Sequence, residues 1–214
     1  MMIQSEIIND VNVGLYGFAT DKYCIMGKKD DSIKKALNVE IIETTALETN
    51  LVKIFMAGNS SGIIVPEILE DYELKNLKKK FDKVLVLEDT HTCVGNLVLM
   101  NDKGILVSHL LRRHKKKIGD FFDLPCEVAT IGKMHTIGTL ALATNKGCLA
   151  HPKLRIPEKE RILKILGVEA TEATVNFGTV HVGAGIIANS NGAVVGSATS
   201  GYELGAISTG LKLG

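Results

Sequence analysis

Several groups of residues in this chain have the types and spacing from which metal, nucleotide or catalytic sites are built. The six histidines are scattered, and the one close His/Cys pair, His91 and Cys93, falls far short of a four-ligand zinc site. Gly183, Gly185 and Ala188 match the G-x-G-x-x-A form of the dinucleotide fingerprint, which requires a helix to open at those glycines. A strand-like segment and an N-S-N-G turn follow instead, and 29 residues remain after Gly185, too few for the rest of such a unit. The sequence therefore predicts no metal and no nucleotide cofactor.

A basic run, RRHKKK at Arg112–Lys117, is the sharpest charge feature of the chain. Such a run is most often a solvated helix face. The apolar positions Ile118, Phe121 and Phe122 place these cations at the start of a helix, where the macrodipole is unfavourable by about 0.3–1 kcal/mol per charge. Cations placed against the local electrostatics suit an anionic partner such as nucleic-acid phosphate. The candidate phosphate contacts are Arg112, Arg113, Lys115 and Lys116.

Composition restricts the class of protein. The chain has 214 residues, 45% of them hydrophobic and 23% charged, which indicates a folded globular protein. The net charge of +1 gives no global electrostatic reason to bind DNA or an anionic membrane. No apolar run approaches the roughly 20 residues of a membrane helix, and the first residues lack a basic and apolar export signal. We therefore expect a cytoplasmic protein with its four cysteines reduced.

The elements that position these residues repeat along the chain. Turn glycines at Gly62, Gly104, Gly147 and Gly192 lie 42, 43 and 45 residues apart, and Tyr23 occupies the matching place 39 residues before Gly62. Nine residues before each marker stands a second recurring position, which is Gly in four of five cases: Gly14, Lys53, Gly95, Gly138 and Gly183. Two periodic markers in register indicate five units of about 43 residues.

Each unit predicts the order strand, turn, strand, helix, strand. Short β-rich runs such as Leu97–Met100 and Ile105–Val107 flank a polar turn in which Asn and Gly accept positive φ. A helix follows, as where Ile156-Pro157-Glu158 opens one and Gly167 stops it. Another strand comes next, except in the fifth unit, where we expect Met2–Ile8 from the N-terminus to substitute and close the ring.

We therefore expect an α/β fold with pseudo-fivefold symmetry, built as a ring of five ββαβ units. The expected organisation is one domain over residues 1–214, with units at approximately 10–50, 51–92, 93–135, 136–180 and 181–214 and a closing strand at 2–8. A WD40 propeller has a similar period, but it needs four strands per blade and predicts none of the five amphipathic helices seen here.

Four stretches carry a resemblance to a known family: GNSSGIIVP (58–66), VGNLVLMNDKGILVSHL (94–110), IGTLALATNKGCLAHPKL (137–154) and TVNFGTVHVGAGIIANSNGAVVG (174–196). Together they resemble the archaeal translation initiation factor 6 family, whose fold is the pentein-type α/β-propeller. The resemblance implies a non-enzymatic factor that binds the intersubunit face of the large ribosomal subunit and prevents association with the small subunit. It also implies a docking surface at one end of the axis, against a ribosomal protein beside the sarcin–ricin loop of the rRNA.

The resemblance and the internal register suggest which residues dock. Asn96 matches the Gly-Asn pair that the family uses for ribosome contact, which we expect at the start of a strand. The equivalent positions of the other units complete a candidate docking ring: Leu15, Ile54, Asn96, Thr139 and Ala184. In this interpretation the phosphate met by the basic run is rRNA phosphate. A closed ring without long strand edges favours a monomer.

Other functions remain as alternatives. Penteins include amidino-group hydrolases and transferases, which need a nucleophilic Cys late in the chain. No Cys follows Cys148, although His181 could serve as a base. A generic repeat scaffold with a partner other than the ribosome is the third interpretation. The segment from Thr174 to Leu211 contains one charged residue, Glu203, so the fifth unit is either the most buried blade or a protein-contact surface.

Overall fold

The five polar turns that mark the repeats each join two antiparallel strands in the computed structural model, which describes all 214 residues. The strand pairs are β2 (Gly17–Ala19) with β3 (Tyr23–Met26), β5 (Ala57–Asn59) with β6 (Gly62–Pro66), β8 (Val98–Met100) with β9 (Ile105–Ser108), β11 (Ala141–Ala143) with β12 (Cys148–Ala150), and β14 (Ile186–Ala188) with β15 (Ala193–Gly196). The second strand of each pair leads outward to a helix. These outer helices are α1 (Asp31–Leu37), α3 (Asp71–Lys80), α5 (Lys115–Phe122), α7 (Ile156–Leu166) and α9 (Gly201–Leu211). A 3-10 turn, η2 (His109–His114), precedes α5.

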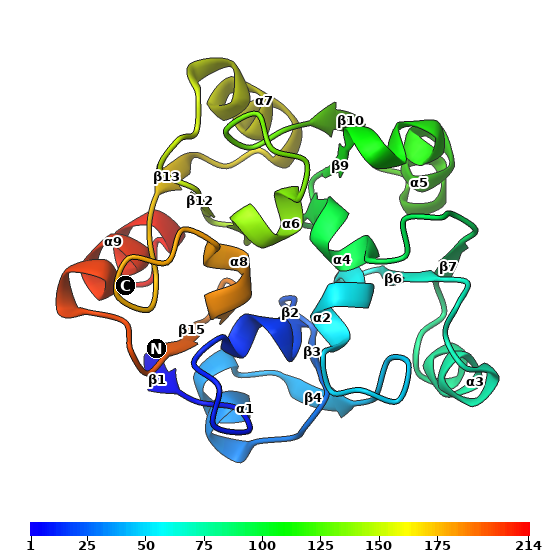
Figure 1. Cartoon of the computed structure of the whole chain (residues 1–214), viewed down its shortest axis with the longest axis horizontal. Helices are drawn as coiled ribbons and strands as arrows, with labels where there is room; N and C mark the ends of the chain where they lie inside the picture. The colour runs from blue at the N-terminus through cyan, green and yellow to red at the C-terminus, as the bar shows by residue number, and fades with distance from the viewer.

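A third strand completes each sheet and runs parallel to the second. In four units it follows the outer helix, as β4 (Glu40–Glu43), β7 (Val84–Leu87), β10 (Cys126–Ala129) and β13 (Ala170–Glu172). In the fifth unit α9 continues to Leu211 and ends at Lys212. There β1 (Met2–Ser5) pairs with β15, Met2 opposite Ala193 and Ser5 opposite Gly196, as expected for ring closure. The result is a mixed α/β propeller of five three-stranded sheets around a central axis (Figure 1).

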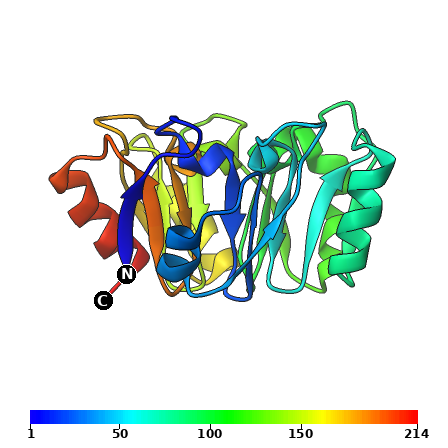
Figure 2. The same ribbon diagram turned by 90° about the horizontal axis from the view of Figure 1, so that it is seen from below.

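Five one-turn helices surround the axis, one at the start of each unit. They are η1 (Val13–Leu15), α2 (Val52–Phe55), α4 (Val94–Leu97), α6 (Ile137–Leu140) and α8 (Val182–Gly185). The sequence did not predict them, because an isolated single turn has no apolar period to detect. We call the end of the axis where they lie the ring end, and the opposite end, with the strand-joining turns, the hairpin end. Figure 2 shows the short helices along one edge of the molecule and both termini at the other.

The location of Asn96 corrects one expectation. We expected it at the start of a strand, but it lies in α4, and β8 begins two residues later at Val98. The expected strand Leu97–Met100 is shorter by one residue for the same reason. The expected bounds of one helix are confirmed: α7 carries Pro157 in its first turn and ends at Gly167 in the left-handed conformation. In the fifth unit Ser200 caps α9.

The hydrophobic core is divided among the five junctions between blades. Each cluster combines the sheet of one unit with residues of the next; one joins Phe18, Tyr23 and Ile25 to Val52, Met56 and Leu77. No blade therefore buries its apolar surface alone. No helix has the combined length and apolar character needed to cross a bilayer.

Asparagines at the hairpin end link neighbouring blades. Asn59 Nδ2 donates to Asn101 O at 3.3 Å, and Asn101 Nδ2 donates to Thr144 O at 3.0 Å. The first unit has Thr20 at this position, and there the Tyr23 hydroxyl donates to Asn59 O at 2.7 Å. Tyr23 also packs its ring against Phe81, with centroids 4.8 Å apart. The tyrosine that replaces glycine in the first unit thus supplies the interblade bond that the missing asparagine would have made.

Candidate functional site

The ring end brings the five predicted docking positions together. Leu15, Ile54, Asn96, Thr139 and Ala184 each occupy the third residue of their one-turn helix. Four of these side chains are half-buried, and Ala184 is buried with 8% of its surface exposed. Thr139 Oγ1 donates to Asn96 Oδ1 at 3.0 Å, which leaves the amide nitrogen of Asn96 without a partner inside the protein. Asn96 is therefore held in place while retaining two free donors.

Glycines allow the short helices to approach one another this closely. A methyl group at Gly138 would overlap Gly95 O, and one at Gly183 would overlap Gly138 O. The same relation holds between Gly14 and Gly183 O and between Gly95 and Lys53 O. The recurring glycine of the sequence is thus explained by backbone contact between neighbouring units around the axis.

Exposed large apolar side chains also gather at the ring end, and the sequence did not predict them. Nine such side chains are exposed in the whole molecule, and seven lie in turns or first helical turns at this end: Ile8, Ile68, Tyr72, Leu110, Ile156, Phe177 and Tyr202. Phe177, in the loop that leads into α8, and Tyr202, in the first turn of α9, are the most exposed at 86% and 89%. Neither of these two residues has an apolar neighbour in the chain, so no periodic signal marks them. We call these seven residues the apolar rim.

A buried carboxylate fixes the turn that carries Phe177. Glu203, in the first turn of α9, accepts hydrogen bonds from Phe177 N at 3.1 Å, Gly178 N at 2.8 Å and Ser200 N at 2.7 Å. Phe177 has φ of 60°, a left-handed conformation that is costly for an aromatic residue. Burial alone would raise the pKa of Glu203, but the hydrogen bonds from Ser200, Gly178 and Thr174 lower it to about 2. The ionised carboxylate thus holds the strained turn open to solvent.

The same clamp recurs in two other units. Glu73 in α3 accepts from Leu47 N and Glu48 N, both at 3.0 Å, and Glu158 in α7 accepts from Gly132 N at 2.8 Å. Both carboxyl groups have lowered pKa values, because these hydrogen bonds outweigh the effect of burial. In each case the first turn of an outer helix fixes the loop that leads into the docking ring.

In the clamp of the third unit, the carboxylate lies on the loop and its partners lie on the helical side. Its carboxylate, Asp89, is on the loop, with 3% of the side chain exposed, and the side chains that bind it come from η2: Arg113 Nε lies 2.9 Å and His114 Nε2 2.7 Å from Asp89 Oδ2. Burial opposes ionisation of Asp89, but the bonds from His91 and His114 and the charge of Arg113 hold the pKa of that carboxyl well below its usual range.

Of the four candidate phosphate contacts, two form ion pairs within the protein and two do not. Arg113 pairs with Asp89, and Lys115 Nζ pairs with Glu127 at 3.1 Å. Arg112 and Lys116 are exposed and form no ion pair. As expected, Lys115–Lys117 occupy the first turn of α5, where the helix dipole disfavours them. Arg112 and Lys116 are therefore the cations of this group that are free to meet a phosphate.

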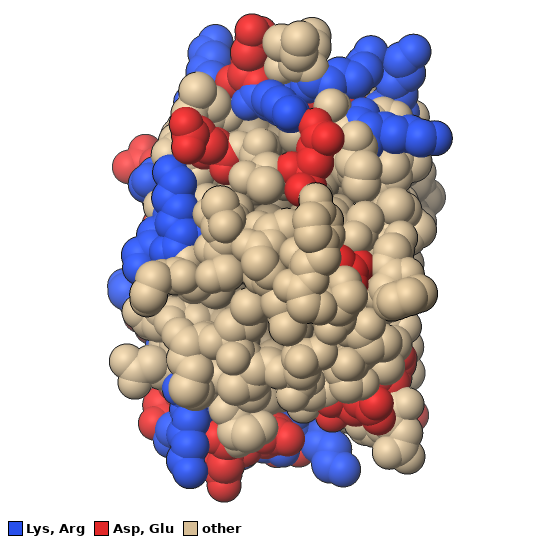
Figure 3. Space-filling view, turned by 90° about the vertical axis from the view of Figure 1, so that its left-hand side faces the viewer, with Lys and Arg blue, Asp and Glu red and all other residues tan.

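The fifth unit combines a buried sheet with an exposed helix: its short helix α8 and strands β14 and β15 are buried. Its helix α9 lies on the outside, with Gly201, Tyr202 and Gly205 exposed, and its charged residue Glu203 is 4% exposed. Figure 3 shows a broad uncharged area over this part of the molecule, with Lys, Arg, Asp and Glu toward its edges. The scarcity of charge thus belongs both to the buried strands of this unit and to the exposed side of α9.

The remaining motifs take other places in the fold. Gly183 and Gly185 lie in α8, and strand β14 follows, so no helix opens there toward a ligand. No group of three or more His, Cys, Asp or Glu side chains is gathered closely enough to hold a metal ion. Cys24, Cys126 and Cys148 are buried, and burial raises the pKa of each thiol.

Comparisons with known proteins agree with this architecture. A family model described as the eIF-6 family matches residues 2–210. Translation initiation factor 6 of Methanocaldococcus jannaschii is 36% identical, and the match covers 100% of this chain and 99% of the relative. The proteins of the same name from Thermococcus onnurineus and Pyrococcus abyssi are 34% and 33% identical, over 92% and 96% of this chain and 91% and 96% of their own lengths.

Proposed function

The chain belongs to the eIF-6 family of non-enzymatic translation initiation factors, and on this premise we propose that it binds the large ribosomal subunit on its intersubunit face. Bound there, it prevents premature association with the small subunit by occupying the space that the small subunit needs. Family membership also removes the amidino-group enzyme from consideration, because the relatives are named as initiation factors.

The observation that carries this proposal is the gathering of exposed apolar side chains at one end of the axis. Seven of the nine exposed large apolar residues lie at the ring end, around Asn96 and the rest of the docking ring. Exposed aromatic anchors surrounded by polar residues are typical of protein-binding surfaces. We therefore assign the ring end to docking, with Leu15, Ile54, Asn96, Thr139 and Ala184 near its centre.

Two parts of this end suit two kinds of partner. The sparsely charged surface with Phe177 and Tyr202 suits a ribosomal protein. The third unit presents Arg112 and Lys116, which suit rRNA phosphate beside that protein, at the sarcin–ricin loop. We propose that the factor binds as a monomer and spans the boundary between the two.

Co-sedimentation with purified archaeal ribosomal subunits tests the main proposal. We expect the protein to migrate with the large subunit alone and to reduce its joining to the small subunit. Asn96→Arg places a bulky charge in the docking ring and abolishes both effects. Asn191→Arg makes the same change on an exposed residue at the hairpin end and preserves both. Absence of co-migration at low salt, or equal loss in the two variants, would contradict the proposal.

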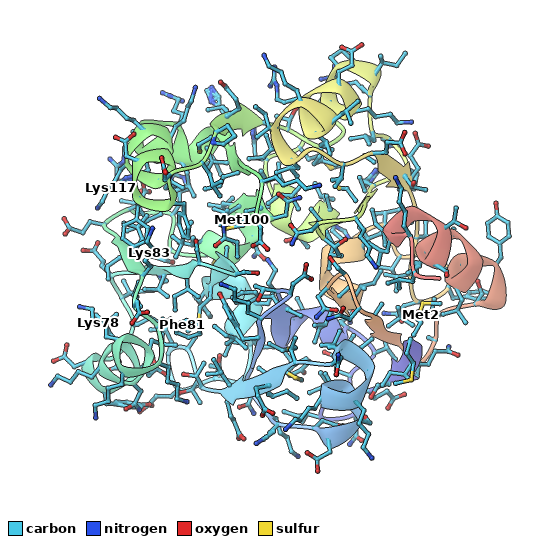
Figure 4. The ribbon with its side chains drawn as sticks, turned by 180° about the vertical axis from the view of Figure 1, so that it is seen from behind. Met2, Lys78, Phe81, Lys83, Met100 and Lys117 are labelled. Carbon is cyan, nitrogen blue, oxygen red and sulfur yellow. The ribbon has the colours of Figure 1, made fainter.

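The rRNA contact is tested by the salt dependence of subunit binding. Each phosphate contact that is lost reduces the slope of log K against log salt by about 1. We expect Arg112→Gln with Lys116→Gln to reduce it by about 2. Lys78→Gln with Lys79→Gln removes the same charge from the hairpin-side end of α3, on the outer rim in Figure 4, and leaves the slope unchanged. An unchanged slope in the first double variant would remove rRNA from the proposal. Arg113 is spared because its loss would leave Asp89 buried without that cation.

A further inference from the structure

Lys53 is the one departure from the glycine pattern around the docking ring. Four units have glycine at this position, and their short helices touch through the backbone. The second unit has a lysine, whose Nζ donates to Gly95 O, in the next short helix, at 2.6 Å. The lysine side chain thus lies between units at the ring end of the axis, where the other units have no side chain.

A cavity of about 50 Å³ lies on the axis beside Lys53. Its wall consists of first-strand residues from all five units together with Lys53, Gly138 and Gly183. The strand residues are mostly apolar and include Phe18, Leu99 and Met100, and Figure 4 shows Met100 close to the axis. Lys53 is the one charged residue in this wall. The cavity therefore combines one cationic group with an apolar lining.

The ammonium group of Lys53 has no counter-ion in the protein. It has three donors and one acceptor, Gly95 O, and it takes part in no ion pair. The carboxylates of Asp21 and Asp102 lie at the hairpin end, where they line a second, polar cavity. Both are already engaged: Asn145 Nδ2 bridges them at 2.7 and 2.6 Å, and Ser190 and Ser60 donate to them as well.

Lys53 is half-buried; an unpaired ammonium in such surroundings is costly, and burial lowers the pKa of Lys53 to about 8. Near neutral pH most of the lysine is still protonated at that pKa. A bound anion would offset the cost and satisfy the remaining donors.

We propose that this axial cavity binds a short-chain monocarboxylate such as acetate. The carboxylate accepts hydrogen bonds from Lys53 Nζ, and the methyl end contacts Ala57, Ala141 and Leu142. The volume admits only a few non-hydrogen atoms, since one water needs about 10–15 Å³ on this measure. A single cation does not match a divalent anion such as sulfate. The site does not depend on the proposed ribosomal role, although Ile54, the next residue, lies in the docking ring.

Thermal unfolding of the purified protein in sodium acetate, chloride and sulfate at equal ionic strength tests the proposal. At pH 7 we expect acetate to raise Tm saturably, by about 3–6 °C at ten times its Kd. Chloride and sulfate produce no saturable rise beyond their general salt effect. Equal behaviour of acetate and chloride would overturn the proposal.

Two further measurements assign the effect to Lys53. Lys53→Met keeps a side chain of similar length and abolishes the acetate response, whereas Lys22→Met, at an exposed hairpin turn, preserves it. If Lys53→Met does not fold, the acetate response of the wild-type protein at two pH values replaces this test. We expect the response to be present at pH 7 and lost at pH 9.5, where the amine is neutral. A response that survives in Lys53→Met, or that is unchanged at pH 9.5, would overturn the site.

Discussion

Residues at the ring end depart from the usual pattern of burial in two opposite ways. The apolar rim exposes side chains that a folded protein usually buries, while Glu73, Glu158 and Glu203 bury carboxylates that it usually exposes. The second feature supports the first, because the buried carboxylates bind the backbone of the loops that present the surface. Each feature leads to a test at one residue.

Phe177→Ala is expected to weaken binding to the large subunit about tenfold, because an aromatic anchor in an interface typically contributes more than 1 kcal/mol. The side chain is 86% exposed, so its loss should leave the free energy of unfolding nearly unchanged. Titration of the protein against large subunits in sedimentation assays gives the affinity. Leu163→Ala removes a 52% exposed side chain from the middle of α7 and serves as the control. Equal affinities for the two variants would exclude Phe177 from the docking surface.

Glu203→Gln is expected to lower the free energy of unfolding at pH 7 by about 2 kcal/mol, since hydrogen bonds to a charged acceptor are lost. The pKa of Glu203 is about 2 in the folded protein, below its unfolded value near 4.3. The carboxylate therefore stabilises the fold above the unfolded pKa, and this contribution is lost as the pH falls from about 4.3 toward 2.

Urea unfolding of wild type and Glu203→Gln from pH 7 to pH 2.5 checks this expectation. The difference between the two proteins should be largest at neutral pH and should shrink in acid. A constant difference across the range would show that the ionised form of Glu203 is not what stabilises the turn.

At the scale of elements, the short helices depend on contacts between units. A single helical turn is too short to be stable alone. Here four of the five turns pack a glycine against a carbonyl of the preceding unit, and Thr139 bonds to Asn96 across one such boundary. The docking ring is therefore a product of assembly of the five units.

Glycine-to-alanine substitutions in two kinds of helix should act in opposite directions. Gly138→Ala places a methyl group against Gly95 O and is expected to cost about 1–3 kcal/mol of stability. Gly205→Ala, on the open side of α9, meets nothing within 4 Å and should stabilise by about 0.5–1 kcal/mol. Chemical denaturation of both variants gives the two values. A neutral Gly138→Ala would mean that the short helices can move apart at little cost.

At the scale of the molecule, the blades share their cores. Every hydrophobic cluster contains residues of two neighbouring units, and β1 joins the two ends of the chain by pairing with β15. We propose on this ground that residues 1–214 form one domain.

Native-state hydrogen exchange tests that proposal. Amides of β3 in the first unit and β12 in the fourth, which share no cluster, should exchange with the same free energy of opening. Denaturant unfolding followed by circular dichroism and by exchange should then give one transition. Separate opening of one sheet at a markedly lower free energy would divide the chain into more than one cooperative unit.

The sequence alone was sufficient for the parts of this protein that local rules govern. Turn glycines, helix caps and the 43-residue period predicted five ββαβ units and a closing N-terminal strand, because turns, caps and periodicity depend on neighbouring residues. The register placed five equivalent positions, including Asn96, at one end of the axis. The family resemblance supplied the expected role.

Only the tertiary structure decided which side chains are free. Arg113 and Arg112 are adjacent and chemically identical, but one pairs with Asp89 from a loop 24 residues away and the other does not. The exposure of Phe177, the cavity beside Lys53 and the one-turn helices likewise depend on contacts between distant units. Such contacts are set by how the five units close around the axis, and local sequence carries no signal for them.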